Sequence, residues 1–402
     1  MPHTACGVPV MQTKTAPAFR KTTETFRAGA KTLPQRNFVS SEIFAQEREK
    51  IFSRQWGLVG HQSQIEQDGD YFTAEVAGER LIIIRDKRGE IHGFYNICRH
   101  RGSRLIENTN GQLSAAIQCP YHAWTYGLDG RLLGAPHMDD VPEFDKADYS
   151  LHPVSAAVWE GFIFVNLADA AENASTQRGG YMPLKEWFAP LAAKFSRWNL
   201  PALRSEKRIE YDVRANWKLI FHNYSECYHC LGVHPELSKI SPSDSAENDL
   251  TEGPFLGGFM RIASDKSLPM SGNTCALPVG NFREKDFRFV FYYSIFPNML
   301  LSLHPDYVMV HQLQPQSQER TLISCDWFFH PAAFERQDFK PQDAIEFWDM
   351  INRQDWHVCE LSQQGISSRA YEPGPYSARE SIPVAWDRYY LQQLQQPDGS
   401  AD

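Results

Sequence analysis

The 402-residue sequence has no long hydrophobic run, few cysteines and no block of basic residues. Its longest apolar stretches, such as "FIFVNL", have the length of a β-strand and are too short to cross a bilayer. Eight cysteines are too few for a disulfide scaffold, because such scaffolds are small and rich in cysteine. The formal net charge of −9, without a basic cluster, excludes a typical nucleic-acid or anionic-membrane binder. We therefore expect a globular protein with neither a nucleic-acid nor a membrane partner.

Half of the cysteines stand close to histidines in the sequence. This pattern favours metal chemistry in a reducing compartment over structural cross-links, so we expect a cytoplasmic protein. The first 23 residues lack acidic side chains and are rich in Thr, Lys and Ala, which weakly resembles an organelle transit peptide. We favour the alternative, a disordered tail.

Hydrophobic periodicity predicts two structured regions. A helix is expected around residues 41–56, and short strands separated by turns follow from about residue 57 to 167. The predicted units are residues 1–44, an N-terminal tail with the start of the first helix; 45–170, an all-β domain; 171–204, a linker and helical connection; 205–390, a second domain; and 391–402, a C-terminal tail.

The second domain is predicted to be α+β, an antiparallel sheet that carries helices. Three strands are expected at residues 287–296, 307–313 and 320–329. Apolar residues near helical spacing predict a helix over residues 341–365. Another helical segment is expected at residues 182–195, after a polar linker.

Two loops, "CRHRG" and "CPYH", each combine one cysteine with one histidine: Cys98 with His100, and Cys119 with His122. A zinc finger usually takes two cysteines from one loop and two histidines from another. Mixed pairs suit a [2Fe-2S] cluster with two cysteines on one iron and two histidines on the other. Neutral imidazoles lower the negative charge of such a cluster and raise its reduction potential. We interpret the four residues as ligands of this cluster; a zinc ribbon is the alternative.

The stretch "NYSECYHCLGVHPE" supplies His229 and His234, five positions apart. In an ideal helix these side chains would point about 140° apart, but the intervening glycine and the following proline can break the helix. Two imidazoles with one carboxylate form the facial triad of mononuclear Fe(II) oxygenases. A zinc site made by Cys227 and Cys230 with the same histidines is the alternative.

The stretches "CRHRGSRL" and "CPYHAWTYGLDGRLL" resemble the Rieske motifs of the ring-hydroxylating, or Rieske non-haem iron, oxygenases. The resemblance spans about residues 45–170 and 205–385. It implies an N-terminal all-β Rieske [2Fe-2S] domain and a helix-grip catalytic domain. "NYSECYHCLGVHPEL" and "QQGISSRAYEPGPYS" are similar to the quaternary-ammonium branch, the glycine betaine, choline and carnitine monooxygenases.

The resemblance also implies the third ligand of the iron. In the family this ligand is an aspartate on a C-terminal helix, and "RQDWHVCELSQQG" places Asp355 there. The competing carboxylates on the same predicted helix are Glu346, Asp349 and Glu360.

Glu226, three residues before His229, matches the acid that bridges the iron site to a Rieske histidine of the neighbouring subunit in related oxygenases. The matching Rieske residue is His122, and the arrangement implies a head-to-tail homotrimer. The commoner residue at this position is aspartate, and an exposed helix acid is the alternative reading. His222 lies nearby, and we expect it to be a structural histidine.

The function that the resemblance implies is that of the terminal oxygenase in a two-component monooxygenase. A separate NAD(P)H-dependent flavin/iron–sulfur reductase supplies electrons, and O₂ oxidises a C–H bond next to nitrogen in a small quaternary ammonium compound such as glycine betaine. The resulting hemiaminal releases formaldehyde. Hydroxylation of an aromatic or heteroaromatic acid is the alternative within the family. An electron-transfer ferredoxin and a zinc-binding interaction protein are the alternatives outside it.

A trimethylammonium group is typically held by aromatic faces. The similarity is weaker across residues 245–300, where the substrate pocket is expected, so the substrate is the least determined part of the prediction. Candidate cage residues in and near this region are Phe255, Phe259, Tyr292, Tyr293, Phe296 and Trp327.

Overall fold

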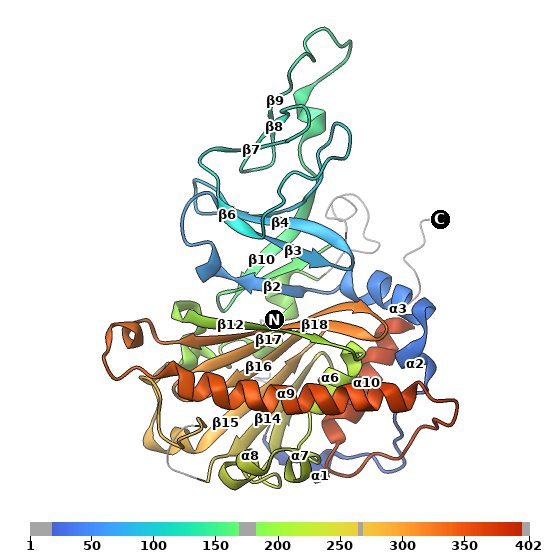
Figure 1. Ribbon diagram of the computed structural model, residues 1–402, viewed down its shortest axis with the longest axis vertical. Helices are drawn as coiled ribbons and strands as arrows, with labels where there is room; N and C mark the ends of the chain where they lie inside the picture. Colours follow the sequence, from blue (N-terminus) through green and yellow to red (C-terminus); the bar gives the residue numbers. More distant parts are fainter. Residues whose placement is uncertain (1–17, 169–181, 264–267, 396–402) are drawn as a thin grey trace, which may run out of the picture.

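The computed structural model describes residues 18–168, 182–263 and 268–395. A smaller β domain stands on a larger domain in which helices cover an antiparallel sheet (Figure 1). This arrangement confirms the predicted α+β fold class. Within the described ranges, no helix combines the length and the apolar character needed to cross a membrane. Residues 169–181, which include the start of the linker predicted at 171–204, lie outside the described residues.

The smaller domain is built on a seven-stranded antiparallel sheet. The apolar run at residues 81–84 lies in β4, and its alternating side chains enter two different cores, one on each face. Both faces are therefore covered, which explains why this strand reads as a continuous apolar run. In spatial order the strands are β2 (Gly57–His61), β11 (Phe162–Asn166), β10 (Pro153–Trp159), β5 (Ile91–Tyr95), β4 (Glu79–Arg85), β3 (Asp70–Val76) and β6 (Asn110–Gln112).

A separate three-stranded sheet forms the tip of the molecule, at the top of Figure 1. It consists of β7 (Ala116–Gln118), β8 (Thr125–Gly127) and β9 (Leu132–Gly134). The loop between β7 and β8 carries Cys119 and His122. The tip therefore holds one of the two predicted cluster loops.

The larger domain is built on an eight-stranded sheet whose neighbouring strands are all antiparallel. The three strands predicted between residues 287 and 329 are present, and the prediction missed β1, β13, β14 and β16. The spatial order is β1 (Arg20–Lys21), β13 (Glu247–Leu250), β14 (Phe255–Arg261), β15 (Phe289–Ile295), β16 (Met299–Leu303), β17 (Val308–Ser317), β18 (Arg320–Phe329) and β12 (Arg204–Val213).

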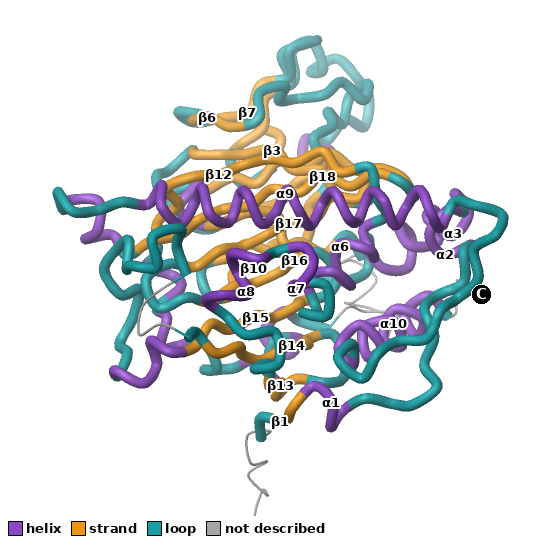
Figure 2. The backbone as a smooth tube through the Cα atoms, turned by 60° about the horizontal axis from the view of Figure 1, so that its bottom comes forward, coloured by secondary structure: helices purple, strands orange, loops and turns teal. Residues whose placement is uncertain are grey.

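The long helix α9 crosses one face of this sheet, as Figures 1 and 2 show, and confirms the predicted C-terminal helix. The first predicted helix is also present, as α3 with a π-helical continuation over Arg48–Phe52. The α-helices are α1 (Thr22–Thr25), α2 (Arg36–Val39), α3 (Ser41–Glu47), α5 (Leu184–Trp187), α6 (Trp217–Tyr224), α7 (Cys230–Val233), α8 (Pro235–Ile240), α9 (Pro341–Ile366) and α10 (Ser381–Leu394).

Two helical regions differ from a simple reading of the sequence. The helical segments expected at residues 182–195 are the single turn α5 followed by short 3₁₀ turns, because Pro190 cannot donate a helical hydrogen bond and Ala193 has a φ of 60°. Helix α10 was not predicted, and it ends at Leu394, beyond residue 390.

The N-terminal segment belongs to the larger domain. Strand β1 pairs with β13 at the edge of the large sheet, and the two lie side by side in Figure 2. Thr25 Oγ1 also lies 2.9 Å from Ser381 Oγ at the start of α10. This part of the expected tail is therefore built into the fold; residues 1–17 lie outside the described chain.

A fully buried ion pair joins the N-terminal helix α3 to the larger domain. Lys218 Nζ lies 2.5 Å from Glu47 Oε1, and neither side chain is exposed. Trp217 Nε1 and Tyr390 Oη also donate to the Glu47 carboxylate, at 2.8 and 2.6 Å. One carboxylate thus connects α3, α6 and α10.

We expect Lys218→Met to lower the free energy of unfolding by roughly 3–5 kcal/mol, because it leaves the Glu47 charge buried without its cation. The matched control is Arg320→Met, which removes an exposed partner of Asp212 and should cost less than about 1 kcal/mol. Urea unfolding followed by tryptophan fluorescence measures both changes. Equal losses of unfolding free energy in the two variants would contradict the importance of the buried Lys218–Glu47 ion pair.

Candidate active site

The two cluster loops have the same backbone design. The Cys98 N–H donates to Ser103 O at 2.8 Å, and the Cys119 N–H donates to Trp124 O at the same distance. Each loop turns through one residue with positive φ, Gly102 at 70° and Ala123 at 57°. Both cysteines are buried, His122 is partly exposed and His100 is exposed. The loops therefore hold their sulfurs inside and turn imidazole edges toward the surface.

The four side chains pair by type. The thiols of Cys98 and Cys119 interact, and burial with this interaction raises the pKa of Cys98. The rings of His100 and His122 lie 4.7 Å apart, centroid to centroid. This is the arrangement expected when two cysteines bind one iron and two histidines bind the other.

A single zinc ion fits these loops less well. Four ligands at 2.0–2.3 Å from one zinc would all lie within roughly 4.6 Å of one another. In the described chain there are two groups of three His, Asp or Glu residues whose donor atoms all lie within 4.8 Å of one another. The residues of the two cluster loops belong to neither group. Among the described residues, the four side chains thus form no compact single-ion site, and their pairing by type is the feature that favours a cluster of two irons.

Two aromatic residues that the sequence reasoning missed support the loops. Tyr126 Oη accepts from the Arg99 N–H at 3.1 Å and lies 3.2 Å from Cys98 Sγ. Trp124 stacks on the His100 ring with an interplanar angle of 5°. Both belong to the "CPYHAWTYG" stretch, but spacing alone did not show which loop they contact.

The second histidine pair meets because the helix breaks between its members. His229 precedes α7, and His234 leaves the helical conformation, with φ −124° and ψ 69°. Pro235 then begins α8. The break predicted from the glycine and proline of this stretch is therefore present.

The pair converges with Asp355 of α9. Asp355 Oδ1 lies 3.2 Å from His229 Nε2 and 2.8 Å from His234 Nε2. The donor atoms of the three residues all lie within 4.8 Å of one another. The competing acid Asp349 lies elsewhere, where it accepts a hydrogen bond from Tyr211.

The outer nitrogens of both histidines have acceptors. His229 Nδ1 lies 2.5 Å from Glu226 Oε1, and His234 Nδ1 lies 2.7 Å from Gln354 Oε1. Each Nδ1 therefore donates its hydrogen outward and leaves the Nε2 lone pair directed at Asp355. Gln354 was missed by the sequence reasoning, although it is the neighbour of Asp355.

Nε2 of His229, Nε2 of His234 and Oδ1 of Asp355 all carry lone pairs and face one another, so they repel unless a cation lies between them. Burial alone would raise the pKa of Asp355, but its hydrogen bonds with His229 and His234 hold that pKa below its ordinary value. Burial alone would lower the pKa of His234, but its contact with Asp355 raises that pKa. A divalent metal takes the place of the protons that this geometry demands. Two imidazoles and one carboxylate fit Fe(II) with positions left open.

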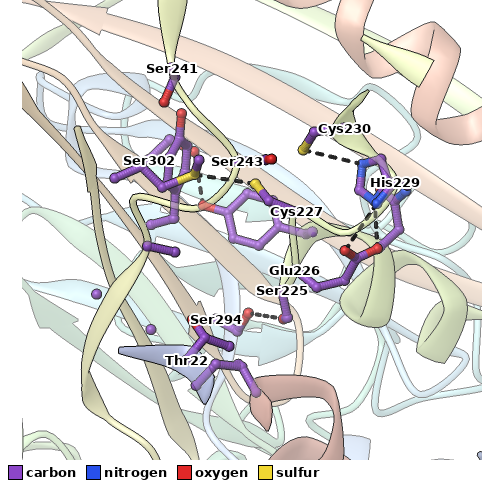
Figure 3. Close-up of a pocket in the computed structure, with 18 of the residues that line it drawn as sticks. Thr22, Ser225, Glu226, Cys227, His229, Cys230, Ser241, Ser243, Ser294 and Ser302 are labelled. Carbon is purple, nitrogen blue, oxygen red and sulfur yellow. Dashed lines mark hydrogen bonds and ion pairs between the residues drawn. The ribbon is translucent and has the colours of Figure 1, made fainter. Parts of the chain in front are cut away.

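This triad lies in a cavity of about 190 Å³. Hydroxyl side chains of Ser225, Ser294 and Ser302 lie on its wall, and Glu226 and His229 face each other at one side (Figure 3). Phe259 and Tyr292 line it, as two of the six expected cage residues. Further aromatic lining residues that were not predicted are Tyr224, Trp348 and Trp356.

The other four cage candidates pack in two hydrophobic cores, and for Tyr293 the reason is that neighbouring side chains on a strand point to opposite faces. Tyr292 and Tyr293 illustrate this alternation. The four are Phe255, Tyr293, Phe296 and Trp327.

His222 is structural, as expected. Its Nε2 lies 2.7 Å from Asp387 Oδ1, and Tyr376 Oη donates to the other oxygen of that carboxylate at 2.7 Å. The hydrogen bonds join α6 to α10.

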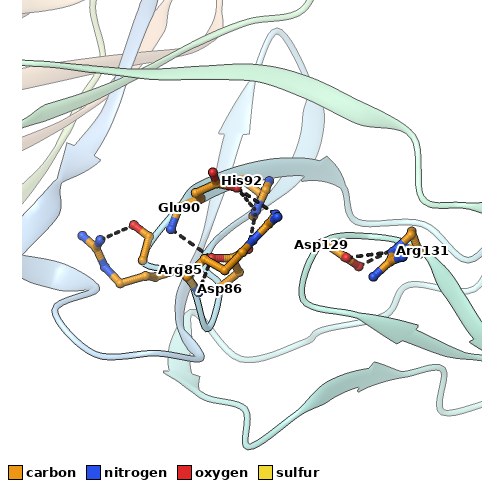
Figure 4. Close-up of polar contacts among 8 residues, drawn as sticks. Arg85, Asp86, Glu90, His92, Asp129 and Arg131 are labelled. Atoms are coloured by element: carbon orange, nitrogen blue, oxygen red, sulfur yellow. Dashed lines mark hydrogen bonds and ion pairs between the residues drawn. The ribbon is translucent and has the colours of Figure 1, made fainter.

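The second compact group of possible metal ligands among the described residues lies at a turn in the smaller domain (Figure 4). It consists of Asp86, Glu90 and His92. Arg88 pairs with Asp86 at 3.2 Å and with Glu90 at 2.8 Å. Burial would raise the pKa of Asp86, but hydrogen bonds from His92, Arg88 and backbone N–H groups lower it to about 2. The guanidinium already supplies the positive charge that a metal would bring, so this group stabilises a turn.

Comparisons with known proteins agree with this geometry. The Rieske [2Fe-2S] domain family matches residues 55–145, and the ring hydroxylating alpha subunit (catalytic domain) family matches residues 200–396. The glycine betaine monooxygenase oxygenase subunit of Chromohalobacter salexigens is 31% identical over 389 residues, covering 87% of this chain and 83% of that protein. The chain belongs to the Rieske ring-hydroxylating oxygenase alpha-subunit family.

Other members of the family are similarly related to this Rieske oxygenase. The carnitine monooxygenase oxygenase subunit of Acinetobacter baumannii is 32% identical over 344 residues, 85% of this chain and 86% of that protein. A crystal structure of the quaternary ammonium Rieske monooxygenase CntA with an inhibitor has a TM-score of 0.77 at 28% identity, covering 91% of this chain and 96% of that one. The present chain is thus a non-haem iron oxygenase subunit with a Rieske [2Fe-2S] domain and a mononuclear iron domain.

Proposed function

We propose that this oxygenase is the terminal component of a two-component monooxygenase that hydroxylates and N-demethylates a small quaternary ammonium compound such as glycine betaine. The observation that carries the proposal is the aromatic cavity beside the triad, in a chain about 30% identical to glycine betaine and carnitine monooxygenase oxygenase subunits. Aromatic faces attract a cation that cannot be satisfied by hydrogen bonds. As an oxygenase component, the chain takes its electrons from a reductase partner, which we propose to be an NAD(P)H-dependent flavin/iron–sulfur protein.

The geometry described above supports a proposal for the residues of the two metal centres. We propose that Cys98, Cys119, His100 and His122 hold the [2Fe-2S] cluster and that His229, His234 and Asp355 hold the mononuclear Fe(II). The cluster stores single electrons, and the ferrous ion, when bound, activates O₂.

The surrounding protein orients these ligands. Glu226 and Gln354 accept the Nδ1 hydrogens of His229 and His234, which keeps both Nε2 atoms available as ligands. Two of the aromatic side chains that line the cavity, Trp348 and Trp356, are buried and offer apolar surface to the substrate methyl groups. These are roles of the chain itself and do not depend on the identity of the amine.

The placement of the two centres supports electron transfer between subunits. The tip sheet β7–β9 and the helices α7 and α8 stand at opposite ends of the molecule in Figure 1. Exposed apolar side chains flank both ends, Tyr121 beside His122 and Tyr228 beside Glu226, at 57% and 59% exposure. We propose that a head-to-tail homotrimer brings His122 of one subunit to Glu226 of the next.

The proposed location is the cytoplasm. The seven cysteines that the structure describes are free thiols, as expected in a reducing compartment.

The reaction is tested by its products. One O₂, two electrons and two protons convert an N-methyl group into N–CH₂OH and one water, and the hemiaminal then releases formaldehyde, a proton and the demethylated amine. We expect one formaldehyde for each amine consumed when purified enzyme, reductase and NAD(P)H act on glycine betaine, carnitine or choline. Hydroxylated product without formaldehyde would contradict N-demethylation.

The second candidate is hydroxylation of an aromatic or heteroaromatic acid, because the rings of Tyr292, Trp348 and Trp356 can also stack on an aromatic substrate. Turnover of benzoate- and pyridine-type acids in the same assay, with no turnover of the amines, would favour it.

A further inference from the structure

A series of hydrogen bonds connects Arg353, on the exposed side of α9, to His311, which lines the cavity. Asp349 accepts from Arg353 Nε at 2.9 Å and from Tyr211 Oη at 2.8 Å. Asn352 Nδ2 lies 3.2 Å from Tyr211 Oη, and Asn352 Oδ1 lies 3.1 Å from His311 Nε2. None of these contacts involves the three proposed iron ligands.

The donors in this chain can point only one way. A carboxylate paired with Arg353 accepts hydrogen bonds and does not donate, so the Tyr211 hydroxyl must donate to Asp349. The oxygen of Tyr211 then accepts the amide N–H of Asn352, whose Nδ2 also lies 3.8 Å from Cys325 Sγ. The amide oxygen of Asn352 is left facing His311, which must carry its hydrogen on Nε2.

The other ring nitrogen of His311 is therefore an acceptor. His311 is 1% exposed, and its Nδ1 has no hydrogen-bond partner in the part of the chain that the structure describes. Burial lowers the pKa of His311 to about 4, which keeps the ring neutral. A buried acceptor without a partner is costly, and a ligand that donates to it relieves this cost.

The position of His311 connects this acceptor to the active site. His311 lies in β17 and lines the same cavity as His229, His234 and Asp355. Its ring centroid is 5.8 Å from that of Trp356, the residue after Asp355. A substrate beside the triad is thus within the space that His311 borders.

We propose that His311 Nδ1 accepts a hydrogen bond from the substrate, which therefore carries an O–H or N–H donor near the carbon to be oxidised. The inference rests on the proposed function, since it takes the bound molecule to be an amine. Glycine betaine has neither donor. The favoured substrates are a quaternary amine with a hydroxyl group or a protonated tertiary amine.

Three pairs of compounds isolate the donor. Carnitine differs from γ-butyrobetaine by one hydroxyl, choline differs from ethyltrimethylammonium in the same way, and dimethylglycine carries an N–H where glycine betaine carries a methyl group. We expect the enzyme to prefer the donor-bearing member of at least one pair by at least about tenfold. The preference should appear both in kcat/KM and in the Kd measured by anaerobic calorimetry.

Two substitutions separate substrate binding from support of α9. His311→Gln retains an amide nitrogen that can donate to Asn352 but has no atom in place of Nδ1, whereas His311→Phe removes both contacts. In both variants we expect the donor-bearing and donor-free members of each pair to differ by no more than about twofold in kcat/KM and Kd. Met309→Leu, on the same face of β17 and also lining the cavity, is the matched control and should retain it.

The outcomes distinguish the two proposals. Equal treatment of both members of every pair by the unmodified enzyme, or a preference that persists in His311→Gln, would overturn the role of His311. The proposed function would then stand as long as any of the amines is demethylated. If none of the six compounds binds or turns over, both proposals fail.

Discussion

Replacing Asp355 with asparagine is expected to remove the mononuclear iron and leave the cluster in place. In the part of the chain that the structure describes, this carboxylate is the one anionic donor that contacts Nε2 of both His229 and His234, and a neutral amide binds a divalent cation far more weakly. Iron analysis should fall from three to two atoms per chain. Turnover should fall by more than about 100-fold, the upper end of what loss of an outer-shell partner costs. The EPR spectrum of the reduced cluster should be unchanged.

Glu346→Gln is the matched control for this prediction. Glu346 is an exposed acid on the same helix, and the sequence alone left it as a competitor of Asp355. Three irons per chain and normal turnover are expected for this variant. Retention of three irons in the Asp355 variant would show that another residue supplies the third ligand.

The proposed metal centres could be predicted because their chemistry is encoded locally. The proposed cluster ligands come from two short loops, and the helix break before His234 follows from a glycine and a proline close in sequence. Helical geometry also separates the competing acids once the helix is known. Asp349 and Asp355 are six residues apart, about 240° around the axis, so they face different sides.

The contacts around the ligands could not be predicted in the same way. Gln354 and Tyr126 act through side-chain orientation, and neither amides nor tyrosines signal a partner by their spacing. His311 is a further example. It stands 44 positions before Asp355, in a strand that was predicted correctly, yet its partner Asn352 becomes visible only when β17 packs against α9.

The fold shows a similar division between local and distant information. Strands β15, β17 and β18 have strong β-branched and aromatic patterns, whereas β16 is a run of five residues between turns. The pairing of β1 with β13 joins two residues near the N-terminus to a strand more than 200 positions away. Short strands of this kind are specified by the sheet edge they meet rather than by their own sequence.

Two inactive variants are expected to restore activity when they share one oligomer. Cys98→Ser lacks a cluster but keeps the iron site, and His229→Ala lacks the iron but keeps the cluster. Alone, each should show no turnover. In a head-to-tail trimer each iron site is completed by one neighbour, so random mixing of equal amounts should complete about one quarter of all sites, and about one third of the sites in the trimers that contain both variants. Formaldehyde release by differently tagged, co-purified oligomers measures the recovery.

The control for this restoration is a mixture of Cys98→Ser chains with chains carrying both substitutions, which should stay inactive because no cluster is present. Within the restored oligomers, adding Glu226→Gln to the Cys98→Ser chain should lower the recovered rate about 10–100-fold, because Glu226 of that chain contacts His229, the proposed ligand of the working iron, and in the proposed trimer also meets the partner's histidine. The same substitution in the His229→Ala chain should have little effect, since that chain supplies only its cluster. Mixed oligomers that form but remain inactive would mean that electrons pass within one chain, despite the opposite placement of β7–β9 and α7 in Figure 1.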